Sequence, residues 1–97
     1  MERGTQGGPT TPAVAVGRAL RTAREARGLS QEQLALASGY SRYYVGLLEQ
    51  GRRNATVLAL FRLGRVLELA PSELLRRAEA LVTHIPDRDT GEGEEAG

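Results

Sequence analysis

The sequence predicts a single, small all-α domain between two segments that lack any helical pattern. Apolar residues recur at helical spacing in five segments between residues 12 and 85, and no segment alternates as a half-buried strand does. A chain of 97 residues has room for one domain. The sequence contains no cysteine, which excludes a disulfide framework and a cysteine-based zinc site.

The first helix is predicted over residues 12–27. Thr11 is the expected N-cap, and Pro12 suits the first helical position because its missing N–H would be unpaired there in any case. Gly28 then tolerates the left-handed backbone that commonly follows a helix end. Together these residues define both ends of the helix.

The next two helices are predicted over residues 31–38 and 42–50, with a very short glycine-containing turn between them. Ser30 can accept a hydrogen bond from the amide of Gln33, whose side chain can return the bond as in a capping box. Ser41 is the expected N-cap of the second of these helices.

The last two helices are predicted over residues 57–69 and 71–85. Thr56 precedes the first of them as its N-cap, and Pro71 opens the second. Apolar residues of the last helix continue at helical spacing to its end, so this helix is predicted to stop only at Pro86.

The net charge of +1 conceals an uneven distribution of charge. Residues 13–85 hold eleven Arg against six Glu, which gives +5, whereas residues 86–97 carry −4. Residues 1–11 are rich in Gly, Thr and Pro and predict a flexible arm, and residues 86–97 predict an acidic disordered tail. All thirteen basic residues are Arg, which binds phosphate and guanine bidentately; genomic base composition is the alternative reason for this bias.

Other function classes find little support. No apolar run approaches the roughly 18 residues that a membrane span needs, and no targeting signal is evident, so we expect a cytoplasmic protein. The only aspartates, Asp87 and Asp89, lie in the tail, His84 stands alone, and the glutamates show no base–nucleophile spacing. We therefore expect no enzyme, no catalytic or metal site, no cofactor and no small-molecule ligand.

The two short helices over residues 31–38 and 42–50, with their tight glycine-containing turn, form a helix-turn-helix arrangement. Such a turn leaves one face of the second helix projecting from the surface. That face carries Tyr43, Gly46, Leu47 and Gln50. The glycine and the two bulky residues, Tyr43 and Leu47, are side chains that a solvated helix would not favour. Gly46 is expected to allow close approach to a groove wall; the alternative is drift at an exposed position.

The chain from about Val16 to Leu75 resembles the Cro/C1-type (XRE) helix-turn-helix family. The resemblance lies in the runs VGRALRTAREARGLSQEQLA (16–35) and GYSRYYVGLLEQGRRN (39–54). The combination GLSQExLA followed by LExG is specific, and the RRNxT stretch is similar to the controller proteins of restriction–modification systems. The resemblance implies a five-helix, lambda-repressor-like DNA-binding domain.

The resemblance also implies a function and its residues. The expected function is a transcriptional regulator that binds double-stranded DNA sequence-specifically, with the helix over 42–50 in the major groove. Base edges would be contacted by four residues, Arg42, Tyr43, Gly46 and Leu47. The DNA backbone would be contacted by seven, Gln31, Ser41, Tyr44, Gln50, Arg52, Arg53 and Asn54. The alternative is a protein-interaction or antitoxin-like module with weak or no DNA binding.

Two positions form an internal ion pair in some members of this family, and here they are Arg24 and Glu49. A Glu beside the inward face of a helix needs such a partner. Leu47 and Gly46 depart from the polar residues common at these positions. Specificity is therefore expected to rest on Arg42 bound to guanine, with Leu47 or Tyr43 touching a thymine methyl.

A homodimer is the other expected partner, because the chain carries more apolar surface than its core needs. The candidate interface residues are Leu58, Phe61, Leu81, Val82 and Ile85. The alternative is that the long last helix folds back over Leu58 and Phe61 within one chain. No membrane partner is expected.

Overall fold

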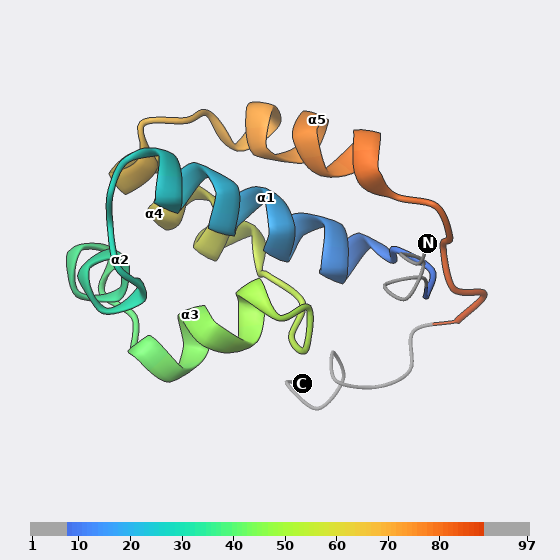
Figure 1. Cartoon of the computed structure of the whole chain (residues 1–97), viewed down its shortest axis with the longest axis horizontal. Coiled ribbons are helices and arrows are strands. Elements are labelled where there is room, and N and C mark those ends of the chain that lie inside the picture. The colour runs from blue at the N-terminus through green and yellow to red at the C-terminus, as the bar shows by residue number, and fades with distance from the viewer. Residues whose placement is uncertain (1–7, 89–97) are drawn as a thin grey trace, which may run out of the picture.

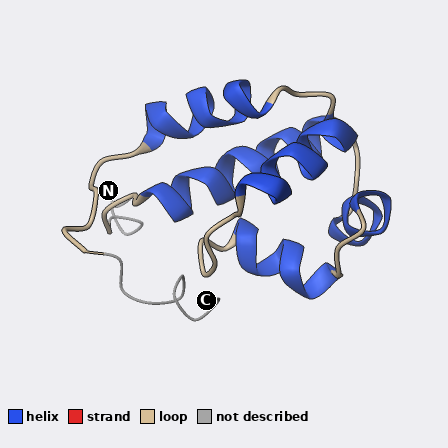
Figure 2. Cartoon of the chain, turned by 180° about the vertical axis from the view of Figure 1, so that it is seen from behind, coloured by secondary structure: helices blue, strands red, loops and turns tan. Residues whose placement is uncertain are grey.

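A computed structural model describes residues 8–88, which form five helices and no strand over that range. In chain order the helices are α1 (Pro12–Ala26), α2 (Gln31–Ser38), α3 (Arg42–Glu49), α4 (Val57–Leu67) and α5 (Pro71–Leu81) (Figures 1 and 2). The predicted all-α fold class is confirmed. Most of the predicted N-terminal arm and acidic tail lies outside the described residues.

Local side-chain caps begin four of the five helices. Ser30 Oγ accepts from the Gln33 amide at 3.0 Å, and Gln33 Oε1 accepts from the Ser30 amide at 2.8 Å, which confirms the predicted capping box. Thr11, Ser41 and Thr56 each accept a hydrogen bond from an amide in the first turn. A cap of this kind stabilises a helix by about 1 kcal/mol, so these helix starts are encoded locally.

Helix α1 lies at the centre of the molecule and packs against both α3 and α5 (Figure 1). The largest side chains of the core are fully buried between the helices; they are Leu20, Leu34, Val45, Leu48, Leu63 and Leu74. Gly17 lets α1 and α3 cross closely, because a Cβ at this position would lie only 2.8 Å from the Glu49 carbonyl oxygen. The α1–α3 crossing in turn determines how α3 is presented at the surface.

Helix α5 ends at Leu81 rather than at the predicted Ile85. Val82 has an extended backbone, with φ −69° and ψ 131°. The amides of Thr83 and His84 donate to the Thr10 carbonyl oxygen at 2.9 and 3.3 Å, and the Thr10 amide donates to Thr83 Oγ1 at 2.9 Å. This pairing with a segment 73 residues away competes with continued helix, and a periodicity count cannot detect it.

Helix α4 also ends early, at Leu67 instead of residue 69, because Glu68 takes a left-handed backbone with φ 60°. The Leu69 amide then donates to the Gly64 carbonyl oxygen at 2.9 Å. Such bonds satisfy the carbonyls that a helix end leaves free.

Among the described residues, no helix has both the length and the apolar character to cross a membrane.

Candidate nucleic-acid interface

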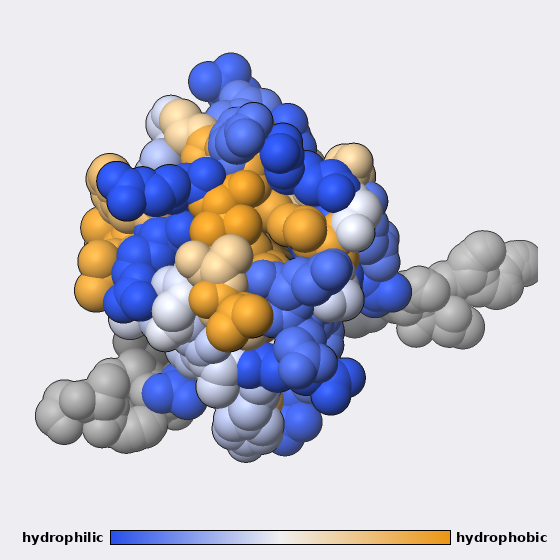
Figure 3. Space-filling view, turned by 90° about the vertical axis from the view of Figure 1, so that its left-hand side faces the viewer, coloured by the Kyte–Doolittle hydropathy of each residue, from blue (hydrophilic) through white to orange (hydrophobic). Residues whose placement is uncertain are grey.

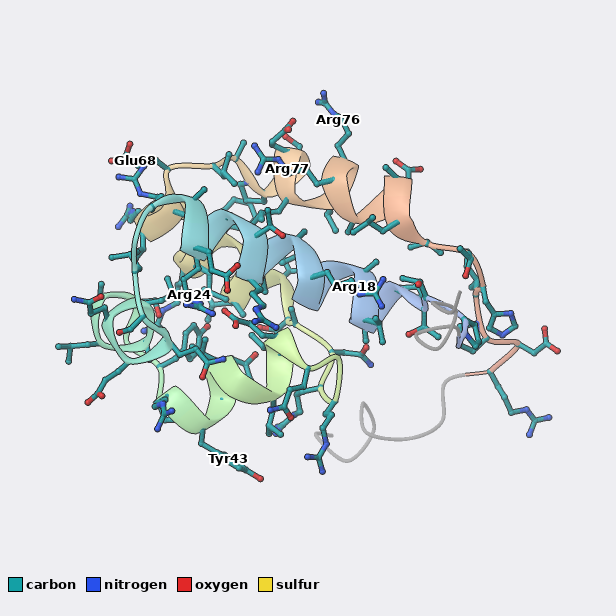
Figure 4. The ribbon with its side chains drawn as sticks, in the orientation of Figure 1. Arg18, Arg24, Tyr43, Glu68, Arg76 and Arg77 are labelled. Atoms are coloured by element: carbon teal, nitrogen blue, oxygen red, sulfur yellow. The ribbon has the colours of Figure 1, made fainter. Side chains whose placement is uncertain are left out.

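Helix α3 is held across α2 by a turn whose first residue is Gly39. Gly39 has φ +83°, a left-handed conformation that glycine adopts without strain. The next amide, that of Tyr40, donates to the Ala35 carbonyl oxygen at 2.9 Å. Val45 and Leu48 of α3 are buried, whereas Tyr43 points away from the body of the molecule and is 75% exposed (Figure 4).

A shallow hollow lies along the outer side of α3. It is lined by Gln31, Arg42, Tyr43, Gly46, Leu47, Gln50 and Arg52. The fold therefore brings all four candidate base-contact residues to one surface, together with three of the candidate backbone-contact residues. Arg53 and Asn54 are exposed in the loop that follows α3.

An ion pair anchors α3 to α1. Arg24 Nε donates to Glu49 Oε2 at 2.7 Å and Arg24 Nη2 donates to Glu49 Oε1 at 2.9 Å, so the guanidinium binds the carboxylate bidentately. Arg24 Nη1 also donates to the Leu29 carbonyl oxygen at 2.8 Å. The hydrogen bonds that Arg24 donates to Glu49 raise the pKa of Arg24, whereas burial acts to lower it. Both side chains are buried, so this pair stabilises the α1–α3 crossing.

The same ion pair extends to the edge of the hollow through Gln31. Gln31 Nε2 donates to Glu49 Oε1 at 3.0 Å, which fixes the side-chain amide at the start of α2 against the end of α3. The Gln31 Oε1 atom lies near Gly46 in the middle of α3. Gln31 therefore braces α3 and reaches the hollow with its remaining hydrogen-bonding capacity.

Tyr44 is held in a stack of aromatic rings and guanidinium groups. Its ring centroid lies 4.8 Å from that of Tyr40, and the Arg53 guanidinium lies 5.8 Å from the Tyr44 ring centroid. The Arg62 guanidinium lies 4.6 Å from the Tyr40 ring centroid.

Neither Tyr40 nor Arg62 was predicted to belong to this site. Tyr40 precedes Tyr44 by four residues, so the sequence spacing could have indicated a contact between the two rings, whereas Arg62 is too distant in sequence to give such an indication.

The surface around α3 carries positive charge from three arginines. Within residues 8–88, no carboxylate oxygen forms an ion pair with Arg42, Arg52 or Arg53. Ser41, another candidate backbone contact, already has a structural role, because its hydroxyl oxygen accepts a hydrogen bond from the Tyr44 amide at 3.0 Å and so caps α3. Arg42 and Arg52 line the hollow and Arg53 lies against Tyr44 in the next loop, so cationic groups gather on this side of the molecule. Such a surface suits a ligand with anionic groups.

Four of the five candidate dimer residues fall on two separate surfaces, and the fifth, Leu81, is 39% exposed at the end of α5. Leu58 and Phe61 are 60% and 59% exposed on α4, where they line a groove together with Ala37 and Val66. Val82 and Ile85 instead line a groove between α1 and the end of α5. The exposure of Leu58 and Phe61 shows that the end of α5 does not fold back over them. Figure 3 shows apolar side chains gathered among charged ones on the side of the molecule to the left in Figure 1.

Replacing Gly46 with Ala should separate folding stability from binding. A Cβ at this position would meet only Gln31 Oε1, at an ordinary 3.9 Å, so the helix should gain about 1 kcal/mol in the free energy of unfolding. If Gly46 permits close approach to a groove wall, the added methyl group should weaken DNA binding about tenfold. Denaturant unfolding and a binding titration on the same sample measure both quantities. A rise in stability with unchanged affinity would identify an unconstrained surface position.

Comparison with known proteins agrees with this geometry. A helix-turn-helix family model matches residues 20–74, which span α2 and α3. An uncharacterized HTH-type transcriptional regulator, y4dJ of Sinorhizobium fredii, is 42% identical over 52 residues, which cover 54% of this chain and 68% of the relative. The control protein C.SmaI of Serratia marcescens is 41% identical over 58 residues, covering 60% and 69% of the two chains.

One solved structure is similar to this chain both in sequence and in the arrangement of its helices. The restriction-modification controller protein C.AhdI from Aeromonas hydrophila is 45% identical, with a TM-score of 0.62 over 64% of this chain and 94% of its own. The family match includes the turn at Gly39 and every residue that lines the hollow on α3. From its sequence, its five helices and these relatives, the chain belongs to the helix-turn-helix family, of the XRE type.

Proposed function

We propose that this protein is a transcriptional regulator that binds double-stranded DNA sequence-specifically and places α3 in the major groove. The observation that carries the proposal is the hollow on α3, where polar and apolar side chains converge and where Arg42 and Arg52 have no carboxylate partner among residues 8–88. A helix that projects from the surface fits the major groove, which displays a distinct pattern of donors and acceptors for each base pair. Family membership and the regulators among the relatives support the same function.

The side chains divide into two groups in this proposal. Arg42 begins α3 and carries the direct reading of bases, because its planar guanidinium matches the two acceptors of guanine. Tyr43 and Leu47 supply apolar contact to a thymine methyl. Arg52 and Arg53 lie beyond the end of α3 and bind phosphates, which supply affinity without reading sequence. Gln31, Ser41, Tyr44, Gln50 and Asn54 are the other proposed backbone contacts.

The dependence of DNA binding on salt tests this function. Phosphate contacts release counterions, so the logarithm of the binding constant should fall linearly with the logarithm of the salt concentration. Arg52→Ala should weaken binding to all sequences about equally and reduce the magnitude of this slope by about 1. Titrations of labelled duplexes at several salt concentrations measure both effects. Binding that is absent, or insensitive to salt, would favour the protein-interaction alternative, which the exposed apolar residues of α2 and α4 also support.

We further propose that the regulator is a homodimer that uses the α4 surface around Leu58 and Phe61. Two exposed large apolar side chains beside a groove are typical of a partner interface on so small a domain. A two-fold dimer would present two copies of α3 to half-sites about 34 Å apart on one face of the DNA. The operator would then be a pseudo-palindrome.

Replacing Phe61 with Asp should shift the protein toward monomer in analytical ultracentrifugation at micromolar concentration. The loss of a central aromatic contact should raise the dimer dissociation constant at least thirtyfold. Ile85→Asp is the matched control, because Ile85 is also exposed and apolar but lies on the separate α1–α5 surface. A wild-type protein that stays monomeric even with DNA present would contradict the dimer. Dissociation by Ile85→Asp alone would move the interface to that second surface.

A further inference from the structure

Arg62 extends from α4 to the turn between α2 and α3. Its Nε donates to the Ser38 carbonyl oxygen at 3.0 Å. Ser38 is the last residue of α2, so this carbonyl is among those that a helix end leaves without a partner inside the helix. The next residue, Gly39, has no room for a side chain on this side, because a Cβ there would overlap the Arg62 guanidinium. Arg62 and the turn therefore fit each other closely.

The Arg62 guanidinium also begins the stack of planar groups that reaches the DNA-facing side of the molecule. It lies over the Tyr40 ring at 4.6 Å, and the Tyr40 and Tyr44 ring centroids are 4.8 Å apart. The Arg53 guanidinium in turn lies 5.8 Å from the Tyr44 ring centroid. Two of the proposed backbone contacts, Tyr44 and Arg53, are therefore held in register with the turn by a series of contacts that starts on α4.

Two contacts hold the Arg62 side chain against the turn rather than against the α3 surface. One N–H group is bound to a backbone carbonyl and one face of the guanidinium covers a tyrosine ring. The side chain also lines the α4 groove with Leu58 and Phe61, and is not among the residues that line the hollow on α3. Its contacts therefore connect it to the α3 surface through the turn and the stacked tyrosines.

We infer that Arg62 is a positioning residue for DNA recognition, one that sets the direction of α3 and the placement of Tyr44 without touching DNA. The inference rests on the proposed function of the α3 surface. The physical basis is that a cation–aromatic contact and a hydrogen bond both act on the single short turn that connects α2 to α3. Loss of these contacts frees the start of α3 while the core beneath it stays packed.

The test compares Arg62→Gln with Arg65→Gln in the full chain, at protein concentrations where sedimentation shows both variants in the same oligomeric state. Arg65 is the matched control, because it lies on the same helix and lines the same groove, so that any effect through the proposed dimer surface is shared by both variants. It makes no hydrogen bond to the turn among the described contacts. Affinity is measured on a duplex selected from a random DNA pool by the wild-type protein. Arg62→Gln should weaken DNA binding about tenfold, with an unchanged dependence of the binding constant on salt. Arg65→Gln should leave the affinity within about twofold of the wild type, when both are measured at a salt concentration that screens the effect of the lost charge.

A double-mutant cycle identifies the route through the stack. In a Tyr40→Leu background, Arg62→Gln should cost much less affinity than it does in the wild type, because the contact that transmits its effect is already gone. Arg62→Lys, which keeps a cation near Tyr40, should recover part of the affinity. Thermal unfolding and sedimentation of each variant provide the stability and the dimer constant, so that affinities are compared between folded proteins of known oligomeric state.

Three results would overturn the inference. They are equal affinities for Arg62→Gln and Arg65→Gln, a salt slope that falls by about 1 as for a direct phosphate contact, and losses that simply add in the Tyr40→Leu background. Failure of the wild-type protein to bind any selected duplex would be a different result, because it would contradict the proposed function itself.

Discussion

Replacing Arg24 with Met should lower the free energy of unfolding by about 3–5 kcal/mol, because it leaves the buried Glu49 carboxylate without its bidentate partner. The substitution also removes the hydrogen bond to the Leu29 carbonyl oxygen in the loop between α1 and α2. The free energy of unfolding of a domain is only about 5–15 kcal/mol, so a large part of it would be lost. Urea unfolding followed by circular dichroism measures the change.

Two controls show whether the loss comes from the unpaired charge. Arg21→Met removes an arginine from the same helix whose ion pair with Glu25 is exposed, and it should cost no more than about 0.5 kcal/mol. Adding Glu49→Met to Arg24→Met should restore much of the lost stability, because it removes the buried carboxylate and replaces it with apolar volume. Equal effects of Arg24→Met and Arg21→Met would show that the buried pair has no special role.

Replacing Arg42 with Ala should remove discrimination at one base position of the operator, at a cost of about 1–3 kcal/mol for the preferred base. Arg42 is exposed at the start of α3, lines the hollow and has no carboxylate partner in the described part of the chain. Its guanidinium group is therefore available to form two hydrogen bonds with a guanine. The measurement is a set of titrations in which each base pair of the selected duplex is changed in turn.

The expected contrast is with Arg52→Ala, which should lower the affinity for every duplex in that set by a similar factor. Both arginines line the same hollow, so their general electrostatic contributions are comparable. Only the placement on α3 distinguishes Arg42. If both variants lose affinity equally across all sequences, then the proposed separation between base reading and phosphate binding is wrong.

Features that are local in sequence, or that a family pattern carries, were predictable, whereas other contacts between distant residues were not. The caps at Ser30 and Ser41 rest on side chains that reach amides three residues away, so the sequence alone indicates where α2 and α3 begin. The family pattern likewise identified the partnership of Arg24 with Glu49, although 25 residues separate them. Apolar periodicity overestimated the length of α5, because pairing with Thr10 ends the helix four residues earlier.

The candidate site shows the same division. Sequence placed the outward residues of α3 correctly on one face, because a short helix after a tight turn can bury only one side. It did not reveal that Gln31 is held by Glu49, or that Arg62 reaches back to the turn. Each of these contacts depends on how α1 and α4 pack against the helix-turn-helix. Gly17 is a further example, since its role becomes visible only at the crossing of α1 with α3.

Selection of bound sequences from a random double-stranded DNA pool tests the central claim most directly. The claim that α3 reads the major groove predicts one enriched motif, with a guanine whose enrichment disappears when Arg42→Ala replaces the wild-type protein. The proposed dimer predicts that the motif repeats in inverted orientation about one helical turn away. A pool that shows no enrichment over the unselected DNA, at low and moderate salt, would contradict sequence-specific recognition by this surface.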